Sequence, residues 1–355
     1  MKVSVLGAGA IGSMIGGLLA HDAEDVEVVL ITRGEHARKI ADRGTITLEG
    51  PWGRREVRVA VSDDPSAVSG SEFVLVTTKS QDTEAAAAAG APHWGGATIV
   101  SIQNGINDAR LLKFVEPTRL VMGMTATNMA LVEPGRVSLQ LGGATIVGPP
   151  AGAGAAVGMS ASDAAAKLLS RIACPSLQFL AHPNAVGARY NKLAINALGY
   201  ASCLSRSNFI TEALAHRGWR NTVGLPIVRE CGRVFEASGI KLERIPGVPS
   251  LPRFQRLMRR MNRPLMGPVI AFVLRRLYNR RPIIFSLQRD LERGKTTEVE
   301  FVNGEVVRLA ESQGGAAPMN RLVVQLVREL EGRGAGSFFS RDEVLARFAS
   351  LAGRA

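Results

Sequence analysis

The chain has 355 residues, 46% of them hydrophobic and 21% charged, a composition typical of a globular protein with room for two domains of roughly 100 to 200 residues. Disordered, collagen-like and disulfide-stapled proteins are excluded. Cys174, Cys203 and Cys231 stand singly, without a CxxC pair or a histidine cluster, so we expect neither a disulfide framework nor a metal site. The chain begins in a strand pattern without a signal peptide, which favours a cytoplasmic protein.

The net charge of +12 is concentrated in one stretch, about residues 244–282, in which nine arginines lie from Arg253 to Arg281. They are Arg253, Arg256, Arg259, Arg260, Arg263, Arg275, Arg276, Arg280 and Arg281. No acidic residue lies between Ile245 and Gln288, so the basicity is local. Few aromatic side chains accompany these arginines, and we therefore expect no nucleic acid partner. The apolar run 269–274 is far shorter than the roughly 20 residues that cross a bilayer, so no transmembrane segment is predicted.

The first part of the chain alternates strands and helices. Strands are expected over 2–6, 26–32, 73–77, 97–103 and 120–127, and helices over 12–21, 35–43 and 82–89. Residues 46–61 indicate a hairpin or loop excursion, and 136–141 with 144–147 indicate a second hairpin. Strands separated by helices at this spacing predict a parallel, doubly wound α/β sheet of the Rossmann type.

The second part of the chain is helical in pattern. A stretch rich in Pro, Gly and Ala at 149–158 is typical of a surface loop, and a helix over 162–172 and a strand over 177–180 follow it. Helices are then expected over 184–205, 211–238, 286–314 and 318–331. Ser340 and Glu343 have the spacing of a capping box that opens a terminal helix. We therefore predict a Rossmann domain over 1–181 and an all-helical domain over 182–355, with the basic stretch as an insertion.

A glycine-rich turn lies between the first strand and the first helix. It consists of Gly7, Ala8, Gly9, Ala10, Ile11 and Gly12. In this GxGxxG pattern the first glycine makes the turn, the second lets backbone approach a pyrophosphate, and the third lets helix and strand pack closely. The next strand ends with Arg33 where an NAD-binding chain would carry an acid, so NADP(H) is favoured as the cofactor.

Polar side chains interrupt two apolar helical patterns of the second part. Lys192, Asn196 and Tyr200 are spaced i, i+4, i+8 and share one stripe of a helix. From the spacing alone this stripe is either solvated or partnered, because an unpaired buried lysine is costly. Ser286 and the run from Thr296 to Gly304, which includes Glu298, form the second interruption. The pattern alone does not place the two interruptions together.

Several blocks in one order resemble the ketopantoate reductase (2-dehydropantoate 2-reductase) family over about residues 1–330. They are GAGAIG at the start, the arginine after the second strand, VTTKSQDT, SIQNG, NKLAINA and SLQRDLERGKTTEVEFVNG. The resemblance implies NADPH-dependent reduction of 2-dehydropantoate in a cleft between a Rossmann domain and a helical domain. It also implies a small 2-oxo acid as the substrate, and it leaves open whether the protein is a homodimer.

The resemblance also implies roles for individual residues. Lys192 would donate the proton, Asn196 and Ser286 would hold the substrate, and Glu298 would contact substrate or cofactor near the lysine. Lys79 and Asn104 would lie at the cofactor, with Asn104 also reaching the neighbourhood of the lysine. These roles suit the chemistry, because hydride transfer to a carbonyl creates an alkoxide that a cationic proton donor stabilises.

Two features depart from the family pattern. Tyr200 stands in the substrate stripe where the biosynthetic enzymes usually carry a second asparagine, which leaves an opine-type or other 2-hydroxy-acid dehydrogenase as an alternative. A non-enzymatic NADPH-binding regulator is the third alternative, and the retained Lys192 and Glu298 argue against it. The basic stretch, longer than the usual connection, could be a subunit contact or active-site cover, a solvated insertion, or a segment that binds a membrane or an acidic partner.

Overall fold

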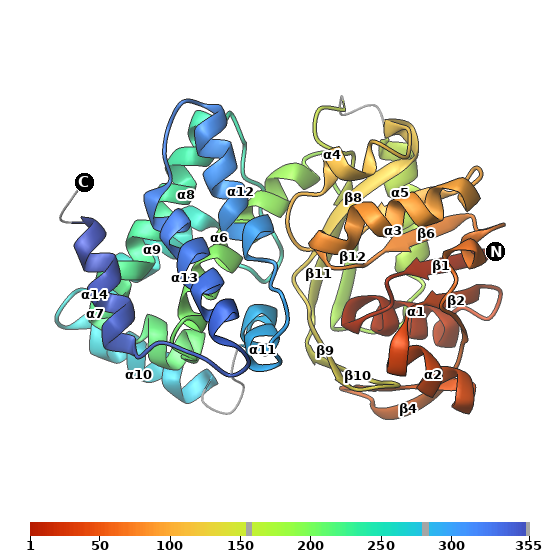
Figure 1. Cartoon of the computed structure of the whole chain (residues 1–355), viewed down its shortest axis with the longest axis horizontal. Helices are drawn as coiled ribbons and strands as arrows, with labels where there is room; N and C mark the ends of the chain where they lie inside the picture. The colour runs from red at the N-terminus through yellow and green to blue at the C-terminus, as the bar shows by residue number, and fades with distance from the viewer. Residues whose placement is uncertain (154–157, 279–283, 353–355) are drawn as a thin grey trace. The chain divides into compact units, whose positions relative to one another are not determined.

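A computed structural model of the chain describes residues 1–153, 158–278 and 284–352 (Figure 1). The chain separates into two compact units. The first consists of Met1–Arg189 with Glu243–Val248, and the second of Tyr190–Leu242 with Pro249–Ala355. The first is built on a β-sheet with covering helices and the second is helical, which confirms the predicted fold class. The predicted domain boundary near residue 181 stays a prediction.

The first unit contains an eight-stranded sheet with the strand order β12-β11-β8-β7-β6-β1-β2-β5. Its strands are β1 (Lys2–Leu6), β2 (Glu27–Ile31), β5 (Ala60–Ser62), β6 (Phe73–Val76), β7 (Thr98–Ser101), β8 (Leu120–Thr125), β11 (Gly143–Gly148) and β12 (Leu177–Ala181). Neighbouring strands are parallel except β8 and β11, which are antiparallel. The predicted parallel sheet is therefore present, with β11 and β12 reversed at one edge.

A second, four-stranded sheet has the order β4-β3-β10-β9. Its strands are β3 (Thr45–Gly50), β4 (Gly53–Arg58), β9 (Asn128–Glu133) and β10 (Arg136–Leu141). The predicted hairpin at residues 46–61 is confirmed as β3 and β4, although β5 leaves it to join the large sheet. The predicted second hairpin is wrong: β10 pairs with β9 and β3, whereas β11 pairs with β8 and β12. Both strands were recognisable from their apolar residues, but the residues of a strand do not by themselves specify its partner.

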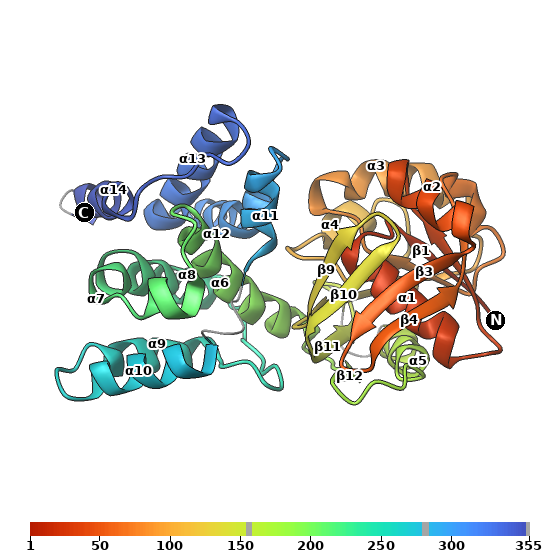
Figure 2. The ribbon, with the colours of Figure 1, turned by 90° about the horizontal axis from the view of Figure 1, so that it is seen from below.

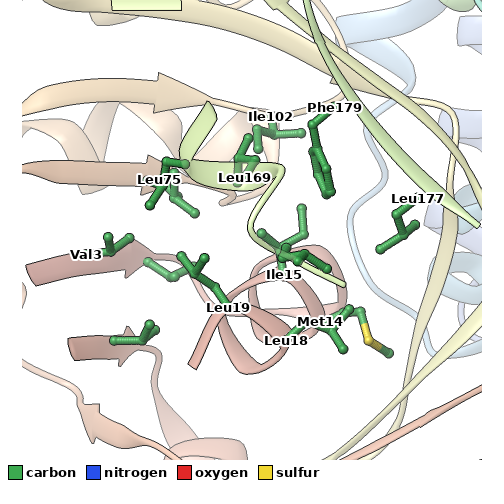
Figure 3. Close-up of a cluster of buried hydrophobic side chains, with 14 of the residues drawn as sticks. Val3, Met14, Ile15, Leu18, Leu19, Leu75, Ile102, Leu169, Leu177 and Phe179 are labelled. Carbon is green, nitrogen blue, oxygen red and sulfur yellow. The ribbon is translucent and has the colours of Figure 1, made fainter. Parts of the chain in front are cut away.

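The helices of the first unit cover the large sheet. They are α1 (Ala10–Asp22), α2 (Gly34–Arg43), α3 (Thr83–Gly90), α4 (Asp108–Leu111) and α5 (Met159–Leu169). Ile15 and Leu19 of α1 are fully buried in one core cluster with Val3 and Leu75 of the large sheet (Figure 3). Leu48 of β3 belongs to the same cluster, so α1 packs between the two sheets. This packing holds the start of α1, where the glycine-rich turn lies, on a rigid support.

The second unit is built from helices. They are α6 (Ala185–Cys203), which begins in the first unit, then α7 (Arg217–Trp219), α8 (Leu225–Ala237), α9 (Leu251–Met261), α10 (Met266–Tyr278), α11 (Ser286–Glu292), α12 (Val299–Ser312), α13 (Pro318–Arg333) and α14 (Arg341–Ala352). The capping box that opens α14 is confirmed, because Ser340 and Glu343 exchange hydrogen bonds of 2.7 and 3.2 Å. No helix among the described residues is long and apolar enough to cross a membrane.

Two predicted long helices are interrupted. The helix expected over 286–314 is wrong, because α11 ends at Glu292 and α12 begins at Val299. Gly294, with φ +63°, stands in this break and favours the end of a helix. The helix expected over 211–238 is also broken: a π-helical segment, Phe209–Leu214, precedes His216, which caps α7 by accepting from the Trp219 N–H. The loop predicted at 149–158 includes residues 154–157, and the basic stretch includes Arg280 and Arg281, all outside the described residues.

Candidate functional site

The glycine-rich turn has the geometry expected of a phosphate-binding loop. Gly7 has φ +86°, and a Cβ atom there would collide with Thr78 in the loop after β6. A Cβ at Gly12 would collide with Thr77 and lie 2.7 Å from Val5 of β1. At Gly9, by contrast, the nearest atom to a Cβ would be the Gly7 oxygen at 3.9 Å. Two glycines are thus demanded by packing, whereas space is left above Gly9, where a pyrophosphate group fits.

The end of β2 lies beside this turn. The backbone N–H groups of Gly7 and Ala8 both donate to the Ile31 oxygen, at 2.9 Å each. Arg33, two residues further on, has an exposed side chain and stands at the start of α2. A guanidinium group at this position is available to a 2′-phosphate on a ribose bound at the turn.

The loops after β6 and β7 carry Lys79 and Asn104, and hydrogen bonds join these loops. The Ser80 hydroxyl donates to the Asn104 backbone oxygen at 2.8 Å, and the Asn107 amide donates to the Ser80 hydroxyl at 3.2 Å. Lys79 and Asn104 are both partly buried. Since Thr78 touches Gly7, the first unit brings the glycine-rich turn, Lys79 and Asn104 to one end of the parallel strands. Ligands of doubly wound sheets bind at this end.

A buried histidine that the sequence did not single out supports the turn. His36 of α2 accepts a hydrogen bond at Nδ1 from the Gly135 N–H, at 2.9 Å. Its Nε2 lies 2.9 Å from the Ser13 hydroxyl, which donates to the Ala8 oxygen at 2.9 Å. Because Nδ1 accepts, Nε2 carries the proton and donates to Ser13. Burial lowers the pKa of His36, which keeps the ring neutral. The feature of the sequence that could have indicated this hydrogen-bond network is Ser13, a polar residue directly after the glycine-rich motif on an otherwise apolar helix.

In the second unit, Lys192 and Glu298 interact electrostatically. Lys192 is partly buried on α6, and Glu298, buried, is the residue before α12. Burial lowers the pKa of Lys192 to about 8, although the negative charge of Glu298 acts in the opposite direction. A lysine with a pKa near neutrality can give up a proton at working pH, which an exposed lysine does poorly.

The break between α11 and α12 accounts for the position of Glu298. In a continuous helix, residues 293–298 would extend the axis of α11. The break instead ends α11 at Glu292, and α12 begins at Val299. The Asn303 side chain, one turn into α12, donates to the Ala197 oxygen of α6 at 3.2 Å and to Asn320 at 2.9 Å. This buried contact fixes α12 against the helix that carries Lys192.

The other two residues of the polar stripe on α6, Asn196 and Tyr200, differ in their exposure to solvent. Asn196 is partly buried, whereas Tyr200 is only 1% exposed. The Tyr200 ring packs edge-on against Phe285, with centroids 6.3 Å apart, and Phe285 also presses on Gly199. The pKa of Tyr200 lies well above its ordinary value because of burial and the charge of Glu298, and the neighbouring Ser286 side chain opposes this.

The second unit therefore brings Lys192, Tyr200, Ser286 and Glu298 into one neighbourhood, with Asn196 one turn from Lys192 on the same helix. Its chemistry is that of a cationic proton donor beside a carboxylate, with neutral hydrogen-bonding groups nearby. The Tyr200 hydroxyl is buried without a well-aligned hydrogen bond in the described part of the chain. Such a set can bind a carbonyl and a carboxylate and protonate an alkoxide.

Comparison with known proteins identifies a family and relatives that this chain resembles. Residues 3–152 match the family described as ketopantoate reductase PanE/ApbA, and residues 184–331 match its C-terminal domain. The 2-dehydropantoate 2-reductase of Pyrococcus horikoshii is 28% identical over 343 residues, which cover 95% of this chain and 100% of that protein. The enzyme of the same name from Halobacterium salinarum is 29% identical over 92% of this chain and 98% of that protein.

Solved structures share the fold. A PanE/ApbA family ketopantoate reductase from Ralstonia eutropha is 27% identical and superposes with a TM-score of 0.72, covering 94% of this chain and 99% of that one. A D-mandelate dehydrogenase solved with NADH and anilino(oxo)acetate has a TM-score of 0.73 at 21% identity, over 94% of this chain and 99% of that one. The chain belongs to the ketopantoate reductase family, and it is an NAD(P)-dependent oxidoreductase that acts on a CH–OH group.

Proposed function

We propose that this protein reduces 2-dehydropantoate to pantoate with NADPH, a step of pantothenate biosynthesis. The observation that carries the proposal is the pairing of Lys192, whose pKa is lowered to about 8, with the buried Glu298. A proton donor of this kind is needed wherever a ketone is reduced to an alcohol. The names of the relatives from Pyrococcus horikoshii and Halobacterium salinarum support the choice of substrate.

The first unit would bind the dinucleotide. Gly7, Ala8, Gly9, Ala10, Ile11 and Gly12 would receive the pyrophosphate at the start of α1, where backbone N–H groups and the helix dipole favour negative charge. The exposed Arg33 would pair with the 2′-phosphate of NADPH. Lys79 and Asn104 would contact the bound cofactor from the loops after β6 and β7. Bound NADPH supplies the hydride for the reaction.

The second unit would bind the 2-oxo acid and complete the reduction. Asn196 and Ser286 would hold the substrate by neutral hydrogen bonds, with Asn104 as a further substrate contact. As hydride reaches the carbonyl carbon, the electron pair of the C=O π bond moves to oxygen, and the Lys192 ammonium donates a proton to that oxygen. The lysine is left as a neutral amine, and Glu298 favours its protonated form before the next cycle.

A second candidate is the reduction of another 2-oxo acid with the same machinery. The observation behind it is Tyr200, whose ring fills buried space beside Phe285 that a smaller amide side chain would leave open. The fold relative named D-mandelate dehydrogenase, solved with NADH, supports this alternative and with it NADH as the cofactor.

A panel of 2-oxo acids assayed with NADPH and with NADH tests the proposal. We expect the highest kcat/KM for 2-dehydropantoate with NADPH. A bulkier or aromatic 2-oxo acid turned over at least tenfold better than 2-dehydropantoate would favour the second candidate. Activity with neither group of substrates would reject both.

A further inference from the structure

The helix α10 has an unpartnered apolar face. Gly267 is buried and Ile270, Ala271 and Leu274 are partly buried, a spacing that places them on one side of the helix. Large apolar side chains on the rest of the helix surface, together with Leu265 just before the helix, are exposed. They are Leu265 (86% exposed), Met266 (40%), Val269 (61%), Phe272 (65%), Val273 (46%) and Leu277 (63%). Single exposed apolar residues are ordinary, but six within thirteen positions mark an interaction surface.

Arginines stand on the same helix as this apolar face and on the helix packed beside it. Helices α9 and α10 lie side by side (Figure 2), and seven exposed arginines stand on them and on the turn that joins them. These are Arg253, Arg256, Arg259, Arg260, Arg263, Arg275 and Arg276. None of the seven forms an ion pair within the described residues. Elsewhere on the chain arginines such as Arg136 and Arg328 do pair with carboxylates. We call the exposed apolar side chains and these arginines together the basic apolar face.

We propose that the basic apolar face binds the surface of a lipid bilayer that contains anionic headgroups. The apolar side chains and the arginines of the face match the acyl-chain layer and the headgroup layer of such a surface. Apolar side chains such as Phe272 and Leu277 would enter the boundary of the acyl chains, and arginines would contact lipid phosphates. The helix has 13 residues, about 20 Å at 1.5 Å per residue, and lies in the plane of the surface rather than crossing it.

Charge distinguishes this partner from a second copy of the chain. A two-fold dimer through this face would set each patch against its own copy, so the arginines of one subunit would approach those of the other. Like charges facing across an interface oppose association. Nucleic acid is also a poor match for this face. Among its described exposed apolar side chains Phe272 is the one aromatic ring on which a base could stack.

Co-sedimentation with vesicles tests the proposal on the full-length protein. Phosphatidylcholine vesicles with 30% phosphatidylglycerol, roughly the charge of an anionic membrane, serve as the probe, and pure phosphatidylcholine vesicles serve as the reference. We expect at least tenfold more protein bound to the anionic vesicles, and less binding as salt is raised. Phe272→Ser with Leu277→Ser, and separately Arg259→Glu with Arg260→Glu, should each lower binding at least tenfold. All four side chains are exposed, so both variants should keep reductase activity on a soluble 2-oxo acid.

Leu141→Ser is the matched control, because Leu141 is 48% exposed but lies on β10, and it should bind as the wild type does. Equal binding to both kinds of vesicle, no binding to either, or wild-type binding by the double serine variant would overturn the proposal. Light scattering addresses the second copy: a dimer that the serine variant dissociates, without vesicle binding by the wild type, would assign the face to self-association instead.

Discussion

The carboxylate of Asp108 accepts hydrogen bonds from both terminal nitrogens of Arg189, at 2.5 and 2.7 Å, and both side chains are almost entirely buried. Asp108 opens α4, and its carboxylate also accepts from the Ala151 N–H at 2.7 Å. Arg189 lies in the first turns of α6, three residues before Lys192. The pair therefore ties the beginning of α6 to the loop that follows Asn104.

Asp108→Asn should destabilise the fold by about 3 to 5 kcal/mol, because it leaves a buried guanidinium without a counter-charge. Burial raises the pKa of Asp108, but Arg189 and the Ala151 N–H outweigh it, so the pKa lies below its ordinary value. The pair thus contributes stability above the ordinary pKa of an aspartate, about 4, and that contribution is lost as pH falls through the folded value. Urea unfolding at pH 7 and pH 3 measures both effects. Asp163→Asn, an exposed carboxylate on α5, should change neither.

Arg33→Ala should raise the KM for NADPH at least tenfold and change the KM for NADH little, because only NADPH loses a charge-assisted contact. Initial rates with each cofactor give the two values. Arg58→Ala is the control, since Arg58 is also an exposed arginine but lies on the second sheet. Equal effects of Arg33→Ala on the two cofactors would show that another residue selects between them.

Lys192→Ala should lower kcat by about two to four orders of magnitude, the range for loss of a general acid or an oxyanion donor, with the affinity for NADPH nearly unchanged. In the wild type, kcat should fall as pH rises past about 8, because the protonated lysine is the active form. A Lys192→Ala enzyme with more than about a tenth of wild-type kcat would contradict the role.

Glu298→Gln provides a sharper version of the same test. Glu298 raises the pKa of Lys192, so its removal should move the alkaline fall of kcat to lower pH. If Glu298 has only a structural role, Glu298→Gln would change the amplitude of the pH profile of kcat and leave its midpoint in place. Asp163→Asn, at an exposed carboxylate on α5, controls for loss of a negative charge.

Tyr200→Asn should destabilise the second unit by about 2 to 4 kcal/mol, because it empties the space that the ring fills beside Phe285. If the ring also borders the substrate, kcat/KM for 2-dehydropantoate should improve relative to a 2-oxo acid without the distal hydroxyl, by about 1 to 3 kcal/mol. Thermal unfolding and the substrate ratio, measured on one variant, separate packing from specificity. Tyr200→Phe keeps the ring and isolates the hydroxyl.

His36→Leu should raise the KM for NADPH and lower stability by about 1 to 3 kcal/mol, because the Gly135 N–H and the Ser13 hydroxyl lose their partner. Burial lowers the pKa of His36, so acidification protonates the unfolded chain first, and stability should fall as pH drops below about 6.5. That slope should be weaker in His36→Leu. His93→Gln, at an exposed histidine, should leave stability and KM unchanged.

Short-range patterns account for what could be predicted from the chain. The strand before Gly7 and the helix after it follow from alternation and helical periodicity within a few residues, and the capping box of Ser340 and Glu343 spans a single turn. The residues of the dinucleotide turn were identifiable for the same reason. Lys192 and Glu298 became candidates through the family resemblance rather than through spacing.

Contacts between distant segments required the folded chain. The strands β10 and β11 are separated by one residue yet join different sheets, because β10 is completed by β3 and β11 by β8 and β12. Glu298 faces Lys192 because a break at Gly294 starts α12 anew, and Arg189 reaches Asp108 across 81 positions. Local periodicity reports which face of an element is buried, whereas the partner of that face is set by the packing of the whole core.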